Sequence, residues 1–410
     1  MQYRYLYVLI ILFYSNCAQT QVFRIDTSHN PKIIVEDFLV GNAGVAVKNV
    51  KYYGLKNALG LFYYKSTFQF LPPYGLILSS GSVHEALGPN NYTASVENYT
   101  KGDKDLSKIA GTKTFDSAIL EFDFMSLTDS ISFVFQFASE EYPEYVKKGV
   151  SDVFGFFVKD YSNNTNDNIG IIAENGTPIT IDLINSDHNS DFYIVNNQLE
   201  YRYKNELTED EYYENQNLFQ FDGFTKSIHS GKKLEAYKKY HFKIAIADAG
   251  DRKFDSWIFI HGNSFASTGK LADIKLEDLK EYFEFFNLDS IELAKSNDKL
   301  TLLVPVYFDF NSYKIKDSSK EYLNYLCNLL TFSGYSVTIN GYADETGTKE
   351  YNLELSQKRA DQVKNYFANN GINQNRISSF GKGEIRLGKN SRSRKVEFIL
   401  YKKSSSKGAF

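Results

Sequence analysis

The sequence is poor in cysteine and proline, and each shortage excludes a class of protein. Only two of the 410 residues are cysteine, Cys17 and Cys327, so a hydrophobic core rather than a disulfide framework has to stabilise the fold. Proline occurs seven times and no low-complexity tract is present, so we expect little disorder. No apolar run reaches the roughly 20 residues that a membrane-spanning helix needs. The mature chain is therefore expected to be soluble or peripheral to a membrane.

Aromatic residues are abundant, with 31 Tyr and 33 Phe, and they recur in short runs of alternating polarity, which favours β-structure. A chain of this length is expected to form two domains. The net charge of −4 conceals an asymmetry, because residues 301–410 carry 17 Lys+Arg and 10 Asp+Glu, whereas residues 1–300 carry 29 and 40. The basic end could meet an anionic polymer, or both charges could belong to ordinary solvated surfaces.

The first 18 residues have the features of an export signal peptide. Arg4 supplies a positive charge, residues 6–14 form a short apolar run, and small residues suit cleavage after Ala18. An alternative makes Cys17 a lipid-modified N-terminus, although Asn16 directly before it fits a lipoprotein cleavage box poorly. Both alternatives predict an exported protein of the cell envelope, in the periplasm or at the outer membrane.

Residues 22–266 predict one large all-β domain, a β-sandwich. Apolar and polar residues alternate over short runs that are bounded by Gly, Asn, Asp and Ser, with almost no helical periodicity. The predicted strands include residues 118–125, 131–138, 153–158, 241–247 and 257–261. The acidic and mostly polar stretch at 205–217 predicts a loop.

The pattern changes after residue 266. Residues 267–300 predict a linker with one short amphipathic helix, in which Leu279 and Tyr282 recur at helical spacing, followed by a polar connector. Residues 301–403 predict an α+β domain of order β-α-β-α-β-β, with two helices on one face of a sheet. Its predicted elements are strands at 302–310, 335–342, 376–380 and 395–401 and helices at 318–331 and 350–369. The last residues, 404–410, predict a polar tail.

One loop and one helix of the C-terminal domain carry charges that suit a zwitterionic ligand. Asp344 lies at the tip of a predicted strand, in the turn at 341–347, where binding groups commonly lie. Arg359 is four residues after Leu355 and shares the inward-leaning face of its helix, where a guanidinium needs a carboxylate partner. Arg359 could hold the carboxylate of an amino-acid head while Asp344 holds its ammonium group. Alternatively, the two side chains form a salt bridge with each other.

The motifs between residues 304 and 400 resemble the OmpA-like, or OmpA/Pal-type, peptidoglycan-binding domain. In chain order they are YFDFNS at 307–312, the loop at 341–347, YNLELSQKRA at 351–360, GKGE at 381–384 and RKVE at 394–397. The resemblance implies that Asp344 and Arg359 hold the diaminopimelate of the peptide stem.

Further site residues follow from the same resemblance. It implies that Asn352 and Ser356 support the loop and the start of the helix, and that the basic Arg394 lies near the site. Tyr342 and Ala343 depart from the family pattern, because they replace the usual His and Thr before the Asp. We expect this departure to change the neighbouring side-chain contacts rather than the pair of Asp344 and Arg359.

Acidic residues gather in the predicted loops of the N-terminal domain, and carboxylate oxygens are ligands that Ca²⁺ takes. The candidate ligands are Glu140, Glu141, Asp152, Asp248, Asp251 and Asp255. Their spacing matches no metal-binding template, and the alternative is that they cap turns through their side chains. No other cofactor is expected.

The same stretches of the N-terminal domain resemble the choice-of-anchor L domain of Bacteroidetes-type surface proteins, over residues 35–265. YGLILSSG at 74–81, YIVNN at 193–197 and FDGFT at 221–225 also fit it. Members of that family are joined to varied C-terminal anchors. The resemblance therefore implies that the peptidoglycan-binding domain is the anchor here, and it assigns no ligand to the β-domain.

Catalytic motifs are missing from the sequence. The six His are scattered, and neither a nucleophile elbow nor a phosphate-binding Gly loop is present. Glu140 and Glu141 could form an acid/base pair, but neighbours on a strand point to opposite faces. We expect a non-catalytic envelope protein anchored to peptidoglycan, with outer-membrane or surface partners and no nucleic acid. The alternatives are an adhesin or carbohydrate-binding protein with a wall anchor, a glycan-active enzyme, and a structural spacer.

Overall fold

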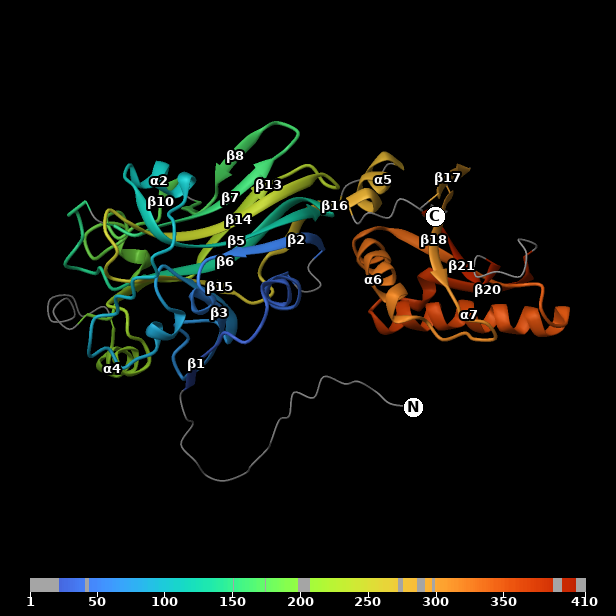
Figure 1. Cartoon of the computed structure of the whole chain (residues 1–410), viewed down its shortest axis with the longest axis horizontal. Helices are drawn as coiled ribbons and strands as arrows, with labels where there is room; N and C mark the ends of the chain where they lie inside the picture. Colours follow the sequence, from blue (N-terminus) through green and yellow to red (C-terminus); the bar gives the residue numbers. More distant parts are fainter. Residues whose placement is uncertain are drawn as a thin grey trace, which may run out of the picture.

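The structure is a computed structural model that describes residues 22–40, 44–149, 151–173, 175–197, 207–271, 276–285, 292–296, 299–385 and 393–402. The predicted signal peptide with Cys17 and the predicted tail at 404–410 lie outside these residues. Two domains lie next to each other (Figure 1), the first built mainly of strands and the second of strands and helices. The predicted fold classes, a β-sandwich followed by an α+β domain, are confirmed.

Two large antiparallel sheets form most of the N-terminal domain, and β9 (Ile171–Ile172) and β10 (Thr177–Pro178) form a separate two-stranded sheet. The larger has the order β1-β3-β4-β15-β6-β12-β11, with β13 and β16 also paired to β6, and the smaller has the order β2-β5-β14-β7-β8. The strands of the larger sheet are β1 (Val22–Asp26), β3 (Leu59–Lys65), β4 (Tyr74–Ser79), β6 (Thr128–Ser139), β11 (Tyr193–Val195), β12 (Gly223–Thr225), β13 (Ile228–Lys233), β15 (Ser256–His261) and β16 (Ala266–Leu271). Those of the smaller are β2 (Val45–Tyr53), β5 (Thr114–Ser126), β7 (Val153–Asp160), β8 (Thr165–Asn168) and β14 (Lys239–Ala249). The five strands predicted by residue number lie within β5, β6, β7, β14 and β15.

Phenylalanine fills the core of this domain. Phe133 and Phe135 are two residues apart on β6 and therefore face the same side. Both rings meet Phe156 of β7, with centroids 4.8 and 4.7 Å apart in edge-to-face arrangements that aromatic pairs favour. Phe122 of β5 and Phe242 of β14 belong to the same buried cluster. The abundance of Phe in the sequence thus reflects strands from both sheets that contribute aromatic side chains to one core.

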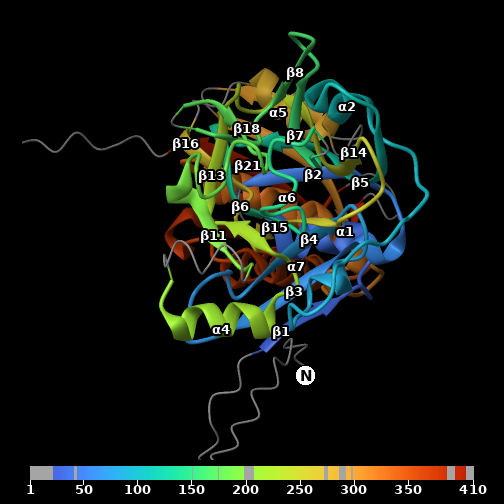
Figure 2. The same cartoon turned by 90° about the vertical axis from the view of Figure 1, so that its left-hand side faces the viewer.

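The loop predicted at 205–217 is wrong, because helix α4 spans Glu209–Leu218. Thr208 caps the helix: its hydroxyl accepts a hydrogen bond from the Glu211 amide, and the Glu211 carboxylate accepts one from the Thr208 amide. The spacing of these two residues was a helix signal in the sequence, but the helix has no strong apolar stripe and buries polar side chains such as Asn215. Figures 1 and 2 show α4 at the end of the domain opposite β8.

A five-stranded sheet and two long helices form the C-terminal domain. The strand order is β17-β18-β21-β19-β20, in which only β19 and β20 pair in parallel. The elements are β17 (Glu292–Ser296), β18 (Lys299–Tyr307), α6 (Asp317–Phe332), β19 (Tyr335–Ala343), α7 (Lys349–Asn369), β20 (Ile377–Glu384) and β21 (Lys395–Lys402). From β18 onward this is the predicted order. The polar connector expected before residue 299 instead contains β17, whose polar residues suit the edge of a sheet.

The two helices share one hydrophobic core with the sheet. Leu326 and Leu330 of α6 and Val363 of α7 are buried in one cluster with Ile339 of β19 and other strand residues. Cys327 lies in the same cluster, as the sequence predicts, and burial raises the pKa of its thiol to about 12. This thiol is therefore a packing group at neutral pH, because a thiolate is the reactive form.

Helix α5 (Leu276–Phe285) is the predicted linker helix, and its apolar face contacts both domains rather than one. Leu279 and Tyr282 are buried in the same hydrophobic cluster as Met125 and Tyr237 of the sandwich and Leu326 of the C-terminal domain. Figure 1 shows α5 between the two domains. The two domains therefore share a core at this point, which restricts their relative motion more than a polar tether would.

Polar contacts in the C-terminal half of α5 add to this packing. Lys238 of the sandwich forms an ion pair with Glu281, with 2.6 Å between Nζ and Oε1. The Tyr282 hydroxyl donates to the backbone oxygen of Tyr325 in α6 at 3.0 Å. Lys48 Nζ donates to the backbone oxygen of Phe285, one of the last carbonyls of α5, at 3.0 Å. The helix is thus held to each domain by directed contacts as well as by apolar ones.

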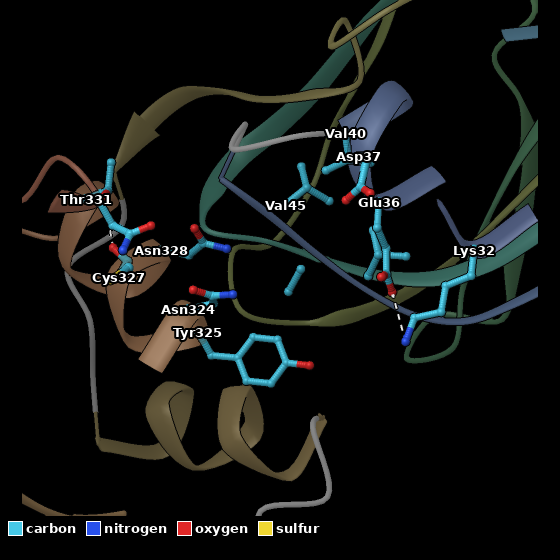
Figure 3. Close-up of a pocket in the computed structure, with 13 residues that line it drawn as sticks. Lys32, Glu36, Asp37, Val40, Val45, Asn324, Tyr325, Cys327, Asn328 and Thr331 are labelled. Atoms are coloured by element: carbon cyan, nitrogen blue, oxygen red, sulfur yellow. Dashed lines mark hydrogen bonds and ion pairs between the residues drawn. The ribbon is translucent and has the colours of Figure 1, made fainter. Parts of the chain in front are cut away.

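A polar cavity of about 490 Å³ lies between the domains near α5 (Figure 3). On the sandwich side it is lined by Lys32 and Glu36, which form an ion pair at 3.8 Å. On the other side it is lined by Asn324 and Asn328 of α6 and by Asn370, which follows the C-terminal end of α7. The interdomain contact is therefore apolar at α5 and open and polar at this cavity.

Helix α7 separates the interdomain contact from the predicted binding loop. Its 21 residues span roughly 30 Å at the usual rise of an α-helix. Asn370 at its C-terminal end lines the interdomain cavity, whereas the turn that contains Asp344 precedes its N-terminal end. Figure 1 shows α7 extending away from the sandwich. The predicted site therefore lies at the end of the molecule farther from the β-domain.

Replacing Tyr282 by Ala should lower the free energy of unfolding by about 3–5 kcal/mol, because the change leaves a cavity in a core that both domains share. Chemical denaturation of the full chain measures the loss. The matched control is Tyr53→Ala, since the side chain of Tyr53 is exposed, and it should change the free energy by less than about 0.5 kcal/mol. Equal small effects of both changes would contradict a shared core.

Candidate functional site

Arg359 is the most buried charged group of the C-terminal site. It lies on α7 and is 0% exposed. Its guanidinium donates to three backbone oxygens, from Nε to Ser312 at 2.9 Å, from Nη1 to Tyr342 at 2.8 Å and from Nη2 to Asp309 at 3.2 Å. Burial lowers its pKa to about 10, so the group stays charged at neutral pH. One cation thereby joins α7 to the loop after β18 and to the end of β19.

Asp344 pairs with Arg394 rather than with Arg359. Its Oδ2 lies 3.0 Å from Arg394 Nη1, and its Oδ1 accepts a hydrogen bond from the Thr346 amide at 3.1 Å. Burial alone would raise the pKa of Asp344, but the hydrogen bonds from Arg394 and Thr346 hold it below its usual value. The carboxylate is therefore ionised at neutral pH. The alternative that Asp344 and Arg359 pair with each other does not hold in this structure.

Asn352 and Ser356 lie on the first turns of α7 and differ in what they contact. Both side-chain polar atoms of Asn352 are buried without a hydrogen-bond partner among the described residues. Ser356 Oγ donates to the backbone oxygen of Leu353 at 2.8 Å and accepts from the Gly383 amide at 2.9 Å, which ties α7 to β20. The Asn352 amide is thus buried and unsatisfied among the described residues, whereas Ser356 holds α7 against β20.

Two glycines allow α7 to approach the sheet closely. A Cβ atom on Gly341 of β19 would lie 2.0 Å from the backbone oxygen of Ser356, and one on Gly381 of β20 would lie 2.6 Å from the amide of Gln357. Neither distance is compatible with a side chain, so helix and strands can meet here only through glycine. This contact fixes the start of α7 beside the loop that holds Asp344.

The two residues that depart from the family pattern, Tyr342 and Ala343, are the last two residues of β19. The Tyr342 hydroxyl donates to Glu397 Oε2 of β21 at 2.9 Å, and Lys395 lies 5.8 Å above its ring. Ala343 is buried. The Tyr342 side chain therefore contacts β21, while its backbone oxygen accepts from Arg359. The side-chain contacts that we expect to differ are therefore those with β21. The hydrogen bond from Arg359 to the backbone oxygen of Tyr342 does not depend on the side chain.

The structure also gathers the acidic residues predicted in the sandwich. Strand pairing brings the end of β6 to the start of β15 and the end of β14 to the start of β7. As a result Glu140, Glu141, Asp152, Asp248 and Asp255 are all buried at one end of the domain. Asp251 differs, because it is partly exposed and its Oδ1 accepts from the Lys253 amide at 3.2 Å. Asp251 thus caps a turn through its side chain, which is the alternative to a Ca²⁺ ligand.

Hydrogen bonds satisfy only part of this buried acidic cluster. Glu141 Oε2 accepts from the Asp152 amide at 2.9 Å, and Glu140 Oε1 accepts from Gln220 Nε2 at 2.9 Å. Asp248 Oδ1 and Asp255 Oδ2 have no partner among the described residues. Glu140 and Glu141 follow β6 in a turn, so the argument that strand neighbours face opposite sides does not apply to them. Both side chains are buried.

Burial sets the protonation of these carboxyls. It raises the pKa of Glu140 and of Glu141 to about 9, that of Asp248 to about 10 and that of Asp255 to about 7. Repulsion adds to the effect, for example between Asp152 and Asp248. Most of the cluster is therefore neutral at pH 7, with protons in place of counterions.

Residues 22–266 match the family described as the choice-of-anchor L domain, and the match covers more than half of the chain. The chain belongs to the choice-of-anchor L family. Residues 307–398 match the OmpA family, and they contain Asp344, Arg359, Asn352, Ser356 and Arg394. Both resemblances seen in the sequence are confirmed.

Known proteins resemble this choice-of-anchor L protein in its OmpA-family part. A peptidoglycan-associated lipoprotein of Brucella melitensis is 37% identical over 82 residues, which are 20% of this chain and 49% of the relative. Outer membrane protein A of Buchnera aphidicola subsp. Schizaphis graminum is 36% identical over 96 residues, which are 22% of this chain and 28% of the relative. The chain thus spans about half the length, or less, of these curated relatives.

Among solved structures, the peptidoglycan-associated lipoprotein from Burkholderia pseudomallei is 31% identical to this chain. It covers 23% of this chain and 86% of its own, with a TM-score of 0.22. The relatives are proteins of the cell envelope, as expected for this one. None of the helices that the structure describes is both long and apolar enough to cross a membrane.

No three His, Cys, Asp or Glu side chains within the described ranges lie close enough together to hold a metal ion. The six candidate Ca²⁺ ligands of the choice-of-anchor L domain therefore do not form a ready set, even though five of them share one buried region. The Ca²⁺ site stays a prediction, and its test is how the domain responds to pH and to the ion.

Replacing Arg394 by Gln should raise the pKa of Asp344, because the burial remains while the hydrogen bond from Arg394 is lost and those from Thr346 stay. The carboxyl ¹³C shift of Asp344, followed by NMR between pH 2 and 7, measures this, with Lys358→Gln, an exposed cation on α7, as the control. An unchanged titration in the Arg394 variant would show that the ion pair does not control this group.

The stability of the sandwich should fall as the pH rises from about 5 to 9. A carboxyl whose pKa is higher in the folded chain than in the unfolded chain stabilises the fold at pH values below its unfolded pKa. This contribution to stability is lost as the pH rises through the folded pKa. Glu141→Gln and Asp248→Asn should flatten the dependence seen by thermal unfolding, whereas Asp251→Asn should not.

The same unfolding experiment tests the Ca²⁺ prediction. If the cluster binds the ion, added Ca²⁺ should raise the unfolding midpoint at pH 8, where more of the carboxyls are ionised, and a chelator should reverse the gain. An unchanged midpoint would contradict the Ca²⁺ prediction and leave protons as the neutralising species.

Proposed function

We propose that this protein is a non-catalytic component of the cell envelope that binds peptidoglycan through its OmpA-family domain, with the diaminopimelate of the peptide stem as the group recognised. The observation that carries the proposal is the convergence of Asp344, Arg359, Asn352 and Arg394 around one loop at the start of α7. A relative with the same domain is named a peptidoglycan-associated lipoprotein, which supports the choice of ligand.

Charge and hydrogen bonding at this site match a zwitterionic amino-acid head. The Asp344 carboxylate suits an ammonium group, and two guanidinium groups, those of Arg359 and Arg394, suit a carboxylate. Three of the five N–H donors of Arg359 are used by backbone oxygens, which leaves two for a ligand. The unpartnered amide of Asn352 offers both a donor and an acceptor beside them.

The site is closed in this structure, since Arg359 is 0% exposed and Asp344 is 5% exposed. Arg394 is the member of the set with the most accessible side chain. We infer that the ligand ammonium replaces Arg394 on Asp344, and that the released Arg394 turns to a ligand carboxylate. The exchange keeps every charge paired and therefore has a small electrostatic cost.

The choice-of-anchor L domain would be held at a fixed distance from the wall. The core shared through α5 and the length of α7 place it at the opposite end of the molecule from the binding loop. In this proposal the sandwich presents its surface to an outer-membrane or surface partner, and export places the protein in the periplasm or at the outer membrane.

A sedimentation assay with purified diaminopimelate-type peptidoglycan tests the proposal on the full chain. Wild type should sediment with the wall, free diaminopimelate should compete, and Asp344→Ala should remain soluble with at least about a tenfold loss of binding, as expected when a buried charged partner is removed. The control is Glu284→Ala, which removes an exposed carboxylate of α5 outside the OmpA-family domain, and it should bind normally. Normal binding by Asp344→Ala would refute the proposed role.

Asn352→Leu separates binding from folding. The amide has no partner among the described residues, so replacing it by an apolar group of similar volume should raise the free energy of unfolding by about 1 kcal/mol or more. The same change should weaken peptidoglycan binding, because the ligand loses a donor and an acceptor. Chemical denaturation and sedimentation on one preparation measure both. A variant that is less stable and binds normally would contradict this role of Asn352.

A further inference from the structure

Large apolar side chains are exposed beside the proposed binding site. Within the described part of the C-terminal domain, the exposed ones lie in the loop after β18, on the first turns of α7 and on β20. They are Phe310 (62%), Tyr313 (45%), Tyr351 (45%), Leu353 (53%) and Phe380 (49%). Exposed apolar groups that gather in one region mark interaction surfaces more often than single ones do.

Three of these rings lie on segments that border the site. The loop that carries Phe310 and Tyr313 is held by Arg359, which donates to the Asp309 and Ser312 backbone oxygens. The Tyr351 hydroxyl donates to Asn311 Oδ1 in that loop. The Tyr351 ring also borders the Asp344 turn, since a Cβ atom on Gly347 would lie 3.4 Å from its Cδ1.

Charged groups next to the rings give this surface a mixed character. Lys358 Nζ lies 5.9 Å from the centroid of the Tyr313 ring, and it pairs with Glu354 at 2.7 Å. Apolar ring faces bordered by hydroxyl and ammonium donors match a pyranose, which has an apolar C–H face and a polar edge. Tyrosine suits such a partner because its ring is apolar and its hydroxyl can form hydrogen bonds.

We propose that Phe310, Tyr313 and Tyr351 form an aromatic platform on which a sugar ring of the glycan strand stacks while the peptide stem occupies the site of Asp344 and Arg359. This inference rests on the proposed function. Two residues separate diaminopimelate from the sugar-linked lactyl group, so three residues of extended stem reach at most about 10 Å. A platform that borders the Asp344 turn is within that reach, whereas the sandwich at the other end of α7 is not.

Two ligands separate the sugar from the peptide. One is the free stem tripeptide that ends in diaminopimelate, and the other is the same tripeptide joined to its N-acetylglucosamine–N-acetylmuramic acid disaccharide. Titration calorimetry with the full chain should show about tenfold tighter binding of the disaccharide form, as expected for stacking on two or three rings. Phe310→Ala/Tyr313→Ala should reduce this preference to less than about twofold and leave the affinity for the free tripeptide unchanged.

The controls distinguish failure of this inference from failure of the proposed function. Tyr53→Ala removes an aromatic ring of the sandwich that is 50% exposed, and it should keep the tenfold preference. Equal affinities of wild type for the two ligands would refute the sugar platform while leaving peptidoglycan binding intact. Failure of both ligands to bind would refute the proposed function as well. Wild type could also bind both ligands equally and self-associate in a way that the double variant abolishes. This result would assign the rings to contact with a second copy of the chain and would overturn the inference.

Discussion

The C-terminal site depends on one buried cation, the guanidinium of Arg359. Its three hydrogen bonds to backbone oxygens hold the loop after β18 and the end of β19 against α7. A lysine could not replace it, because only the planar fork of arginine presents several donors in fixed directions. The loop with the exposed rings and the turn with Asp344 are placed by this single side chain. The proposed binding role of Arg359 is therefore combined with a structural one.

The two domains differ in how their buried ionisable groups are paired and in the direction in which the pKa values are shifted. In the OmpA-family domain, carboxylate and guanidinium groups are paired, and the pKa of Asp344 is held below its usual value. In the choice-of-anchor L domain, carboxyls are buried without enough partners, and the pKa values of Glu140 and Glu141 are raised. The first arrangement keeps charge available for a zwitterionic ligand. The second favours neutral carboxyls, so the sandwich interior responds to pH while the site around Asp344 and Arg359 keeps its charges.

Helix α5 makes these two domains parts of one body rather than two modules on a tether. A tether would let the sandwich sample many orientations relative to the wall, whereas the shared core around Tyr282 fixes one orientation. Because α7 then spans the C-terminal domain from the polar cavity to the binding loop, the binding end and the sandwich face away from each other. Such an arrangement suits a protein that presents one domain from a fixed support.

Alternating polarity by itself determined five strands of the sandwich and four of the C-terminal domain, and the 3.6-residue period determined α5, α6 and α7, because each pattern reflects which face of an element is buried. The ordered motifs around Asp344 and Arg359 also identified the candidate site. Helix α4 was missed because its burial is polar, although the capping residues Thr208 and Glu211 signalled it. Only the tertiary structure decided that Arg394 is the partner of Asp344, that the Asn352 amide has no partner among the described residues, and that five carboxyls from separate segments are buried at one end of the sandwich. These facts depend on contacts between residues distant in the chain, which local spacing does not encode.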